Sequence, residues 1–80
     1  MTWEWKVWRL RRRWDRARER ALLASASTRK PALEKLDAIA GNLVTLEETQ
    51  LSRRDRHRLF DDIVEGIAEA REIMRQKQDA

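Results

Sequence analysis

An amphipathic segment at the start of the chain constrains the fold more than any other feature. Its apolar residues recur at spacings of three and four, which is the pattern of one face of an α-helix. Those residues are Trp3, Val7, Leu10, Trp14, Ala17 and Ala21. The pattern predicts a helix over residues 3–24, with Thr2 placed to cap it and the apolar face packed on the rest of the chain.

The same segment carries a second face, of tryptophan and arginine. All four tryptophans and seven of the fourteen arginines lie within it. At about 100° per residue, Trp5 and Trp8 point away from the apolar face, and each has an arginine four residues later, the spacing of a cation–π pair. Exposed tryptophan and arginine dominate binding hot spots. The predicted partner-binding residues are Trp5, Trp8, Arg9, Arg12, Arg13 and Arg16.

A different interpretation applies to the tryptophans on the apolar phase. Trp3 and Trp14 follow the apolar spacing, so we expect them in the core. For Trp5 and Trp8, packing on a neighbouring helix or on a second subunit is the alternative to an open binding face.

The remainder of the chain predicts a helical hairpin. The Ser and Thr residues of 25–30 indicate a linker, and Pro31 suits the first turn of a second helix over 31–50. The residues from Ser52 to Asp55 have the pattern of a capping box and mark a third helix over 53–76. The turn between these two helices is tight, so they should be antiparallel.

The expected fold is all-α, with the N-terminal helix packed on the hairpin in a single domain over residues 1–80. We expect the second helix to be continuous at Gly41, because its apolar phase is kept across that residue. The alternative ends the helix at Gly41 and uses Thr45 to Glu48 as a capping box for a short following helix. That would resemble a helix-turn-helix, but the following segment is acidic, which fits DNA recognition poorly.

The charge of the chain is uneven, although the total is +4. Residues 1–30 carry a net charge of +7, whereas residues 31–80 carry −3. A basic arm suits nucleic acid or an acidic protein surface, or it lies against acidic helices within one molecule or one dimer. Eighty residues supply a small core, so we also expect self-association as a homodimer. A second basic patch is predicted at Arg53, Arg54 and Arg56.

No pattern of reactive residues is present. The chain has no cysteine, and its one histidine, His57, has only Asp61 at a metal-ligand spacing, too few ligands for a site. The acidic stripe of the third helix should be solvated and ionised; it comprises Asp61, Asp62, Glu65, Glu69 and Glu72. We therefore expect no catalytic residue, no metal, no cofactor and no enzymatic activity.

The sequence also lacks the marks of a membrane protein. No apolar run approaches the roughly 20 residues that span a bilayer, and the N-terminus lacks the apolar core of a signal peptide. We expect a cytoplasmic protein. Binding of the first helix to a membrane surface is the least favoured of the binding hypotheses that we retain.

In length and composition the chain resembles the small accessory proteins of phages and other mobile elements, including anti-CRISPR proteins. The resemblance implies an inhibitor or adaptor that occupies one surface of a nucleic-acid-handling complex by stoichiometric protein–protein contact. The blocking surface would be the tryptophan–arginine helix or the acidic stripe. The alternatives are direct nucleic-acid binding through the first helix, and a small phage packaging or assembly factor of the terminase type.

Overall fold

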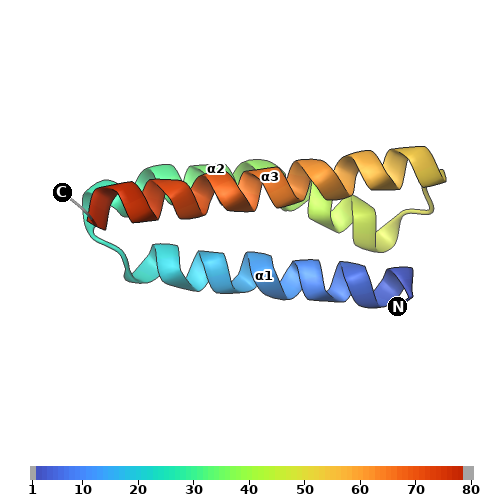
Figure 1. The fold of residues 1–80 in the computed structure, drawn as a ribbon, viewed down its shortest axis with the longest axis horizontal. Coiled ribbons are helices and arrows are strands. Elements are labelled where there is room, and N and C mark those ends of the chain that lie inside the picture. Colours follow the sequence, from blue (N-terminus) through green and yellow to red (C-terminus); the bar gives the residue numbers. More distant parts are fainter. Residues whose placement is uncertain (1, 79–80) are drawn as a thin grey trace.

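Three helices form the fold over the residues that the structure describes, 2–78 (Figure 1). In this computed structural model α1 spans Trp3–Leu23, α2 spans Ala26–Glu48 and α3 spans Arg53–Gln78. The helices run up, down and up, so that α2 is antiparallel to both neighbours and α1 is parallel to α3. The all-α, three-helix prediction is confirmed. None of these helices within residues 2–78 has the length and apolar character needed to cross a membrane.

The first helix follows the prediction closely. The Trp5 N–H donates a hydrogen bond of 3.2 Å to the Thr2 hydroxyl, which caps the helix as expected. The apolar stripe faces the other two helices, and Trp3 at its start is half-buried against the core. The fully buried members are Val7, Leu10, Trp14, Ala17 and Ala21.

The predicted linker over 25–30 is wrong, because α2 begins at Ala26. The Ser25 carbonyl accepts the N–H groups of Thr28 at 3.0 Å and Arg29 at 2.8 Å, which closes the first helical turn. Thr28 is buried and continues the core stripe of α2 by one more turn. The residues that read as a linker are therefore helical because one of them packs in the core.

Pro31 consequently lies inside α2 and not in its first turn. A proline has no N–H to give to the carbonyl four residues earlier, here that of Ser27. Ser27 is exposed, so water can satisfy this carbonyl, and the burial of Thr28 and Ala32 on either side holds the segment helical.

The second helix is continuous through Gly41, as predicted. The Thr45 hydroxyl donates a hydrogen bond of 3.0 Å to the Gly41 carbonyl inside the helix, so Thr45 does not cap a new helix. The helix–turn–helix alternative is therefore wrong. The apolar residues whose phase is kept across Gly41 are buried at Leu36, Ile39, Leu43 and Leu46, whereas Val44 is exposed.

Close packing of α2 on α3 forms the larger part of the core. The Ser52 hydroxyl accepts the Asp55 N–H at 3.2 Å, which starts α3 where the capping pattern predicts. Halfway along α3, Gly66 lies so close to α2 that an added Cβ would stand 2.7 Å from the Ile39 Cγ2 atom. The absence of a side chain at Gly66 therefore sets the distance between these two helices.

One exposed ion pair ties α1 to α2. The Arg11 guanidinium binds both carboxylate oxygens of Glu47, with the Nε–Oε2 distance at 3.0 Å. This hydrogen bond raises the pKa of Arg11 above its ordinary value. The pair connects residues 36 positions apart in the sequence and adds a surface contact to the buried contacts between α1 and the hairpin.

We expect Glu47→Gln to lower the free energy of unfolding by about 0.5–1 kcal/mol. The substitution removes the negative charge of Glu47 but keeps the shape of its side chain, and the two hydrogen bonds of the pair lie at the surface. Urea denaturation at low and at high salt would measure the effect, which should shrink as salt screens the pair. The matched control is Glu48→Gln, an exposed neighbour. Equal losses in the two variants would contradict a specific role for the Arg11–Glu47 pair.

Candidate binding surface

The six predicted partner-binding residues lie together on the outer side of α1. They line one shallow depression of about 470 Å³ on the surface. Trp5 is 41% exposed and Trp8 is 58% exposed, so neither indole is part of the core. Their packing on a neighbouring helix of the same molecule, which the sequence left open, is excluded by this exposure.

Cation–π contacts organise this surface. The Arg9 guanidinium carbon lies 5.3 Å from the Trp5 ring centroid, and that of Arg12 lies 5.8 Å from the Trp8 centroid. The four-residue pairing predicted from the sequence is therefore confirmed. The two indoles are 6.4 Å apart and inclined at 43°. The arginines restrict the indoles, which lowers the entropy that would be lost on binding, and their N–H groups remain available to an acceptor.

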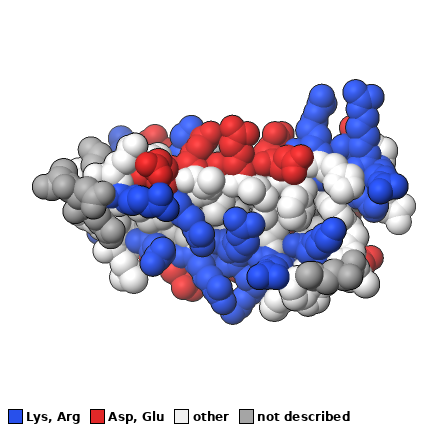
Figure 2. Space-filling model, in the orientation of Figure 1, with Lys and Arg blue, Asp and Glu red and all other residues white. Residues whose placement is uncertain are grey.

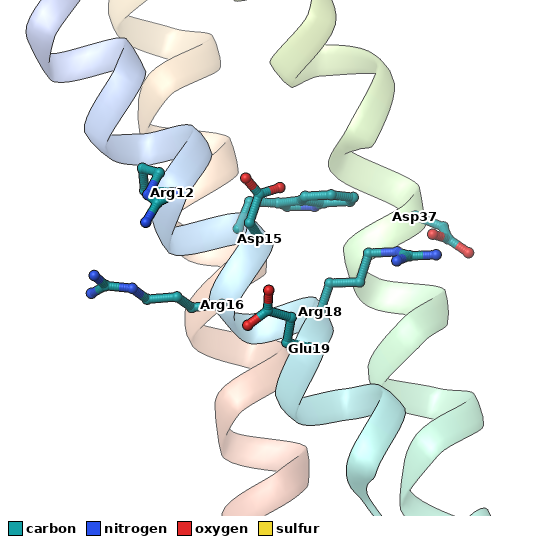
Figure 3. A pocket seen from close by; sticks show the side chains of 7 residues that line it. Arg12, Asp15, Arg16, Arg18, Glu19 and Asp37 are labelled. Atoms are coloured by element: carbon teal, nitrogen blue, oxygen red, sulfur yellow. The ribbon is translucent and has the colours of Figure 1, made fainter.

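A second depression, of about 620 Å³, adjoins the first and extends from α1 to α2 (Figure 3). Arg12 and Arg16 belong to both depressions. Two acids of α1, Asp15 and Glu19, line it as well, and Arg18 extends toward α2, which contributes Asp37. The tryptophan–arginine surface is thus bordered by carboxylates on the α2 side, and its charge is mixed there.

The second predicted basic patch is only partly free. Arg53 and Arg54 are exposed at the start of α3. Arg56 instead lies over the Trp3 ring, with its guanidinium carbon 4.7 Å from the centroid. His57 contacts the same indole edge-on at 5.6 Å. Arg56 and His57 therefore help to hold the N-terminal end of α1 on α3.

The acidic stripe of α3 is solvated along most of its length. Asp61, Asp62, Glu65 and Glu72 are exposed. Glu69 pairs with Lys35 of α2 at 2.8 Å, and this pairing raises the pKa of Lys35. Among residues 2–76, whose side chains the structure describes, no three metal-ligating groups converge.

A basic row on α1 was not recognised in the sequence. Every residue immediately before a buried residue of the α1 stripe is basic. Figure 2 shows Lys and Arg side chains across the lower half of one broad face, over α1, and Asp and Glu in a line over α3. The sequence indicates this row by a second set of residues at spacings of three and four, each one position before a residue of the apolar stripe. The members of this basic row are Lys6, Arg9, Arg13, Arg16 and Arg20.

No protein-family model matches this chain, and comparison with curated proteins and with solved structures finds no match.

Proposed function

We propose that this protein is a non-enzymatic binding module that docks the outer face of α1 on an acidic surface of a protein partner. The partner belongs to a nucleic-acid-handling complex, which the protein inhibits or adapts by occupying one of its surfaces. The observation that carries the proposal is the depression lined by two exposed tryptophans and four arginines. Large aromatic anchors beside guanidinium donors are the composition of protein-binding hot spots.

The charge pattern favours a protein over a nucleic-acid backbone. Asp15 and Glu19 border the surface next to Arg12 and Arg16, and both acids would repel phosphate. A protein surface can instead offer carboxylates to the arginines and donors to these acids. In addition, Arg9 and Arg12 each occupy a position over an indole that a stacked base would need.

Direct nucleic-acid binding is the second candidate, because a basic row follows the same helix (Figure 2). Titration with single-stranded and duplex nucleic acid, read by tryptophan fluorescence at two salt concentrations, separates the two. Binding that quenches the tryptophans and weakens steeply with salt would replace the protein-docking proposal. Absence of binding at low salt is the result we expect.

Trp5→Ala with Trp8→Ala should abolish capture of the partner while the helical content stays within a few per cent of the wild type. Both side chains are exposed, so their removal leaves the core intact, whereas truncation of hot-spot aromatics typically costs at least about 2 kcal/mol of binding each. Capture from nuclease-treated extract, followed by titration of the captured protein, measures the binding. Circular dichroism measures the helical content.

The matched control is Leu22→Ala with Val44→Ala, which removes apolar side chains that are 42% and 43% exposed elsewhere on the surface. This control should bind like the wild type. Unfolding of the tryptophan variant, or equal loss of binding in the control, would contradict the assignment of the surface.

A further inference from the structure

We propose that the broad face formed by α1 and α3 binds a second copy of this chain, with the basic row of each protomer against the acidic stripe of the other. The basic row shares Arg9, Arg13 and Arg16 with the tryptophan–arginine surface, whereas Trp5 and Trp8 lie outside the row. This inference does not depend on the proposed function, because it requires only a second copy of the chain and neither tryptophan. The two charged rows lie on the same face of the molecule and run along its length (Figure 2).

The basic row and the acidic stripe extend over the same part of the bundle. Two residues are at the same level when they lie at the same position along the bundle axis. Trp3 contacts Arg56, His57 and Phe60, and Arg20 lines a pocket with Arg71, Met74 and Arg75. The difference in residue number across these pairs is 51 to 57 and averages 54. Because α1 and α3 are parallel and rise equally per residue, this difference applies along their whole length. Residue 6 of α1 is thus level with residue 60 of α3, and residue 13 with residue 67.

Three of the four exposed acids consequently have basic residues at their own level, and one of the three, Glu72, also pairs with Arg75 of its own helix at 3.3 Å. Asp61 is within one residue of the level of Lys6. Glu65 is level with the interval between Arg9 and Arg13, since 54 added to those positions gives 63 and 67. Glu72 falls in the same way between the levels of Arg16 and Arg20.

One symmetry operation brings these partners together. A two-fold axis that lies in the face and runs parallel to the helices exchanges its upper and lower halves and keeps every level unchanged. The acidic stripe of one protomer then meets the basic row of the other, twice per dimer, as an isologous interface requires. A two-fold axis in the face but perpendicular to the helices would instead place acid on acid.

The face also has the size and the central strip that an interface needs. Perpendicular to the shortest axis, the Cα extents of the whole molecule are 42 × 20 Å, so a rectangle of about 840 Å² bounds this face. Stable interfaces of standard size bury about 800 Å² per partner. Uncharged surface separates the two rows in Figure 2. Val64 and Ala68 follow Phe60 at four-residue spacing, on the side of α3 that contacts Trp3, and would line the axis.

The test is an exchange of charges between the two rows. One variant carries Lys6→Glu and Arg13→Glu, and the other carries Asp61→Lys and Glu65→Lys. The wild type should sediment at twice 9.6 kDa at low salt. It should shift toward the monomer in 1 M salt, where the screening length falls from about 10 Å to about 3 Å.

Each variant alone should dimerise at least about 100-fold more weakly, because like charges then face each other at every reversed position. An equimolar mixture should restore a heterodimer, since the reversed α1 row of one variant meets the reversed α3 stripe of the other. Trp5→Ala with Trp8→Ala should dimerise like the wild type, which separates this test from that of the proposed function.

A control pair makes equal changes in net charge away from the face: Arg18→Glu with Lys30→Glu, and Glu34→Lys with Asp37→Lys. Arg18 and Asp37 line the depression that faces α2, and all four side chains are exposed. Both control variants should remain dimeric. A monomeric wild type at low salt would overturn the proposal, and so would a mixture of the two test variants that stays monomeric or controls that dissociate equally.

Discussion

Trp14→Ala is expected to lower the free energy of unfolding by about 3–5 kcal/mol, the range for truncating a buried aromatic side chain. Trp14 is buried where α1 meets α2, and its indole N–H donates 3.0 Å to the Leu36 carbonyl. A domain of this size has a total stability of roughly 4–12 kcal/mol, so the loss is a large part of the whole. Urea denaturation followed by circular dichroism would measure it.

Trp14→Phe separates the contribution of the indole hydrogen bond and the lost ring atoms from that of the rest of the aromatic side chain. Leu36 lies inside α2, so its carbonyl keeps its helical partner and no buried group is orphaned. We expect a loss of about 1–2 kcal/mol for the hydrogen bond and the missing ring atoms together. Trp8→Ala, at an exposed position, is the control and should change stability by less than about 0.5 kcal/mol. A Trp14→Ala variant as stable as this control would contradict the buried position of Trp14.

Gly66→Ala should destabilise the protein by about 1–2 kcal/mol, although alanine is the better helix former by about 1 kcal/mol. The new Cβ would stand 2.7 Å from Cγ2 and 2.9 Å from Cδ1 of Ile39. Ile39 is buried and β-branched, so its side chain has little freedom to rotate away. Thermal and urea denaturation would both report the loss.

Gly41→Ala is the matched control, because Gly41 is exposed and nothing lies within 4 Å of its added Cβ. This variant should be about 0.5–1 kcal/mol more stable than the wild type. Combining Gly66→Ala with Ile39→Ala should cost less than the two single losses together, because the new methyl group occupies space that Ile39 leaves. Additive losses, or a stabilising Gly66→Ala, would show that α2 and α3 are not held apart by this contact.

Local patterns sufficed for much of the fold. The start of α1 and the start of α3 each depend on a hydroxyl cap within three residues, at Thr2 and Ser52, and both caps form. The core positions of α1 follow from helical spacing alone, because one side of that helix is apolar and the opposite side is polar.

The start of α2 could not be predicted in this way. Ser and Thr favour turns in isolation, and the helical state of residues 26–30 depends on the burial of Thr28 against other helices. The packing of Thr28 against other helices therefore outweighs the turn propensity of the Ser and Thr residues. The position of Arg56 over Trp3 is of the same kind, since it joins residues 53 positions apart.

The clustering of the six residues of the candidate binding surface could be predicted from the sequence, but the residues of other helices beside it could not. Its six members share one helix, so their clustering follows from spacing. Asp37 comes from α2, and its approach to the surface depends on how α1 rotates on the hairpin. The match in level between the basic row and the acidic stripe likewise required the packing of α1 beside α3.

The unequal packing of the three helices has a consequence for the order in which the molecule opens. α2 and α3 share a larger interface than α1 has with either of them. Local unfolding follows the element with the fewest contacts, so α1 detaches at a lower free energy than the hairpin does. Both proposed interfaces use side chains of α1, and a ligand that requires the docked helix suppresses its opening by mass action. Association would thus protect α1 from proteolysis and hydrogen exchange, and the lifetime of the protein in the cell would depend on the supply of its partner.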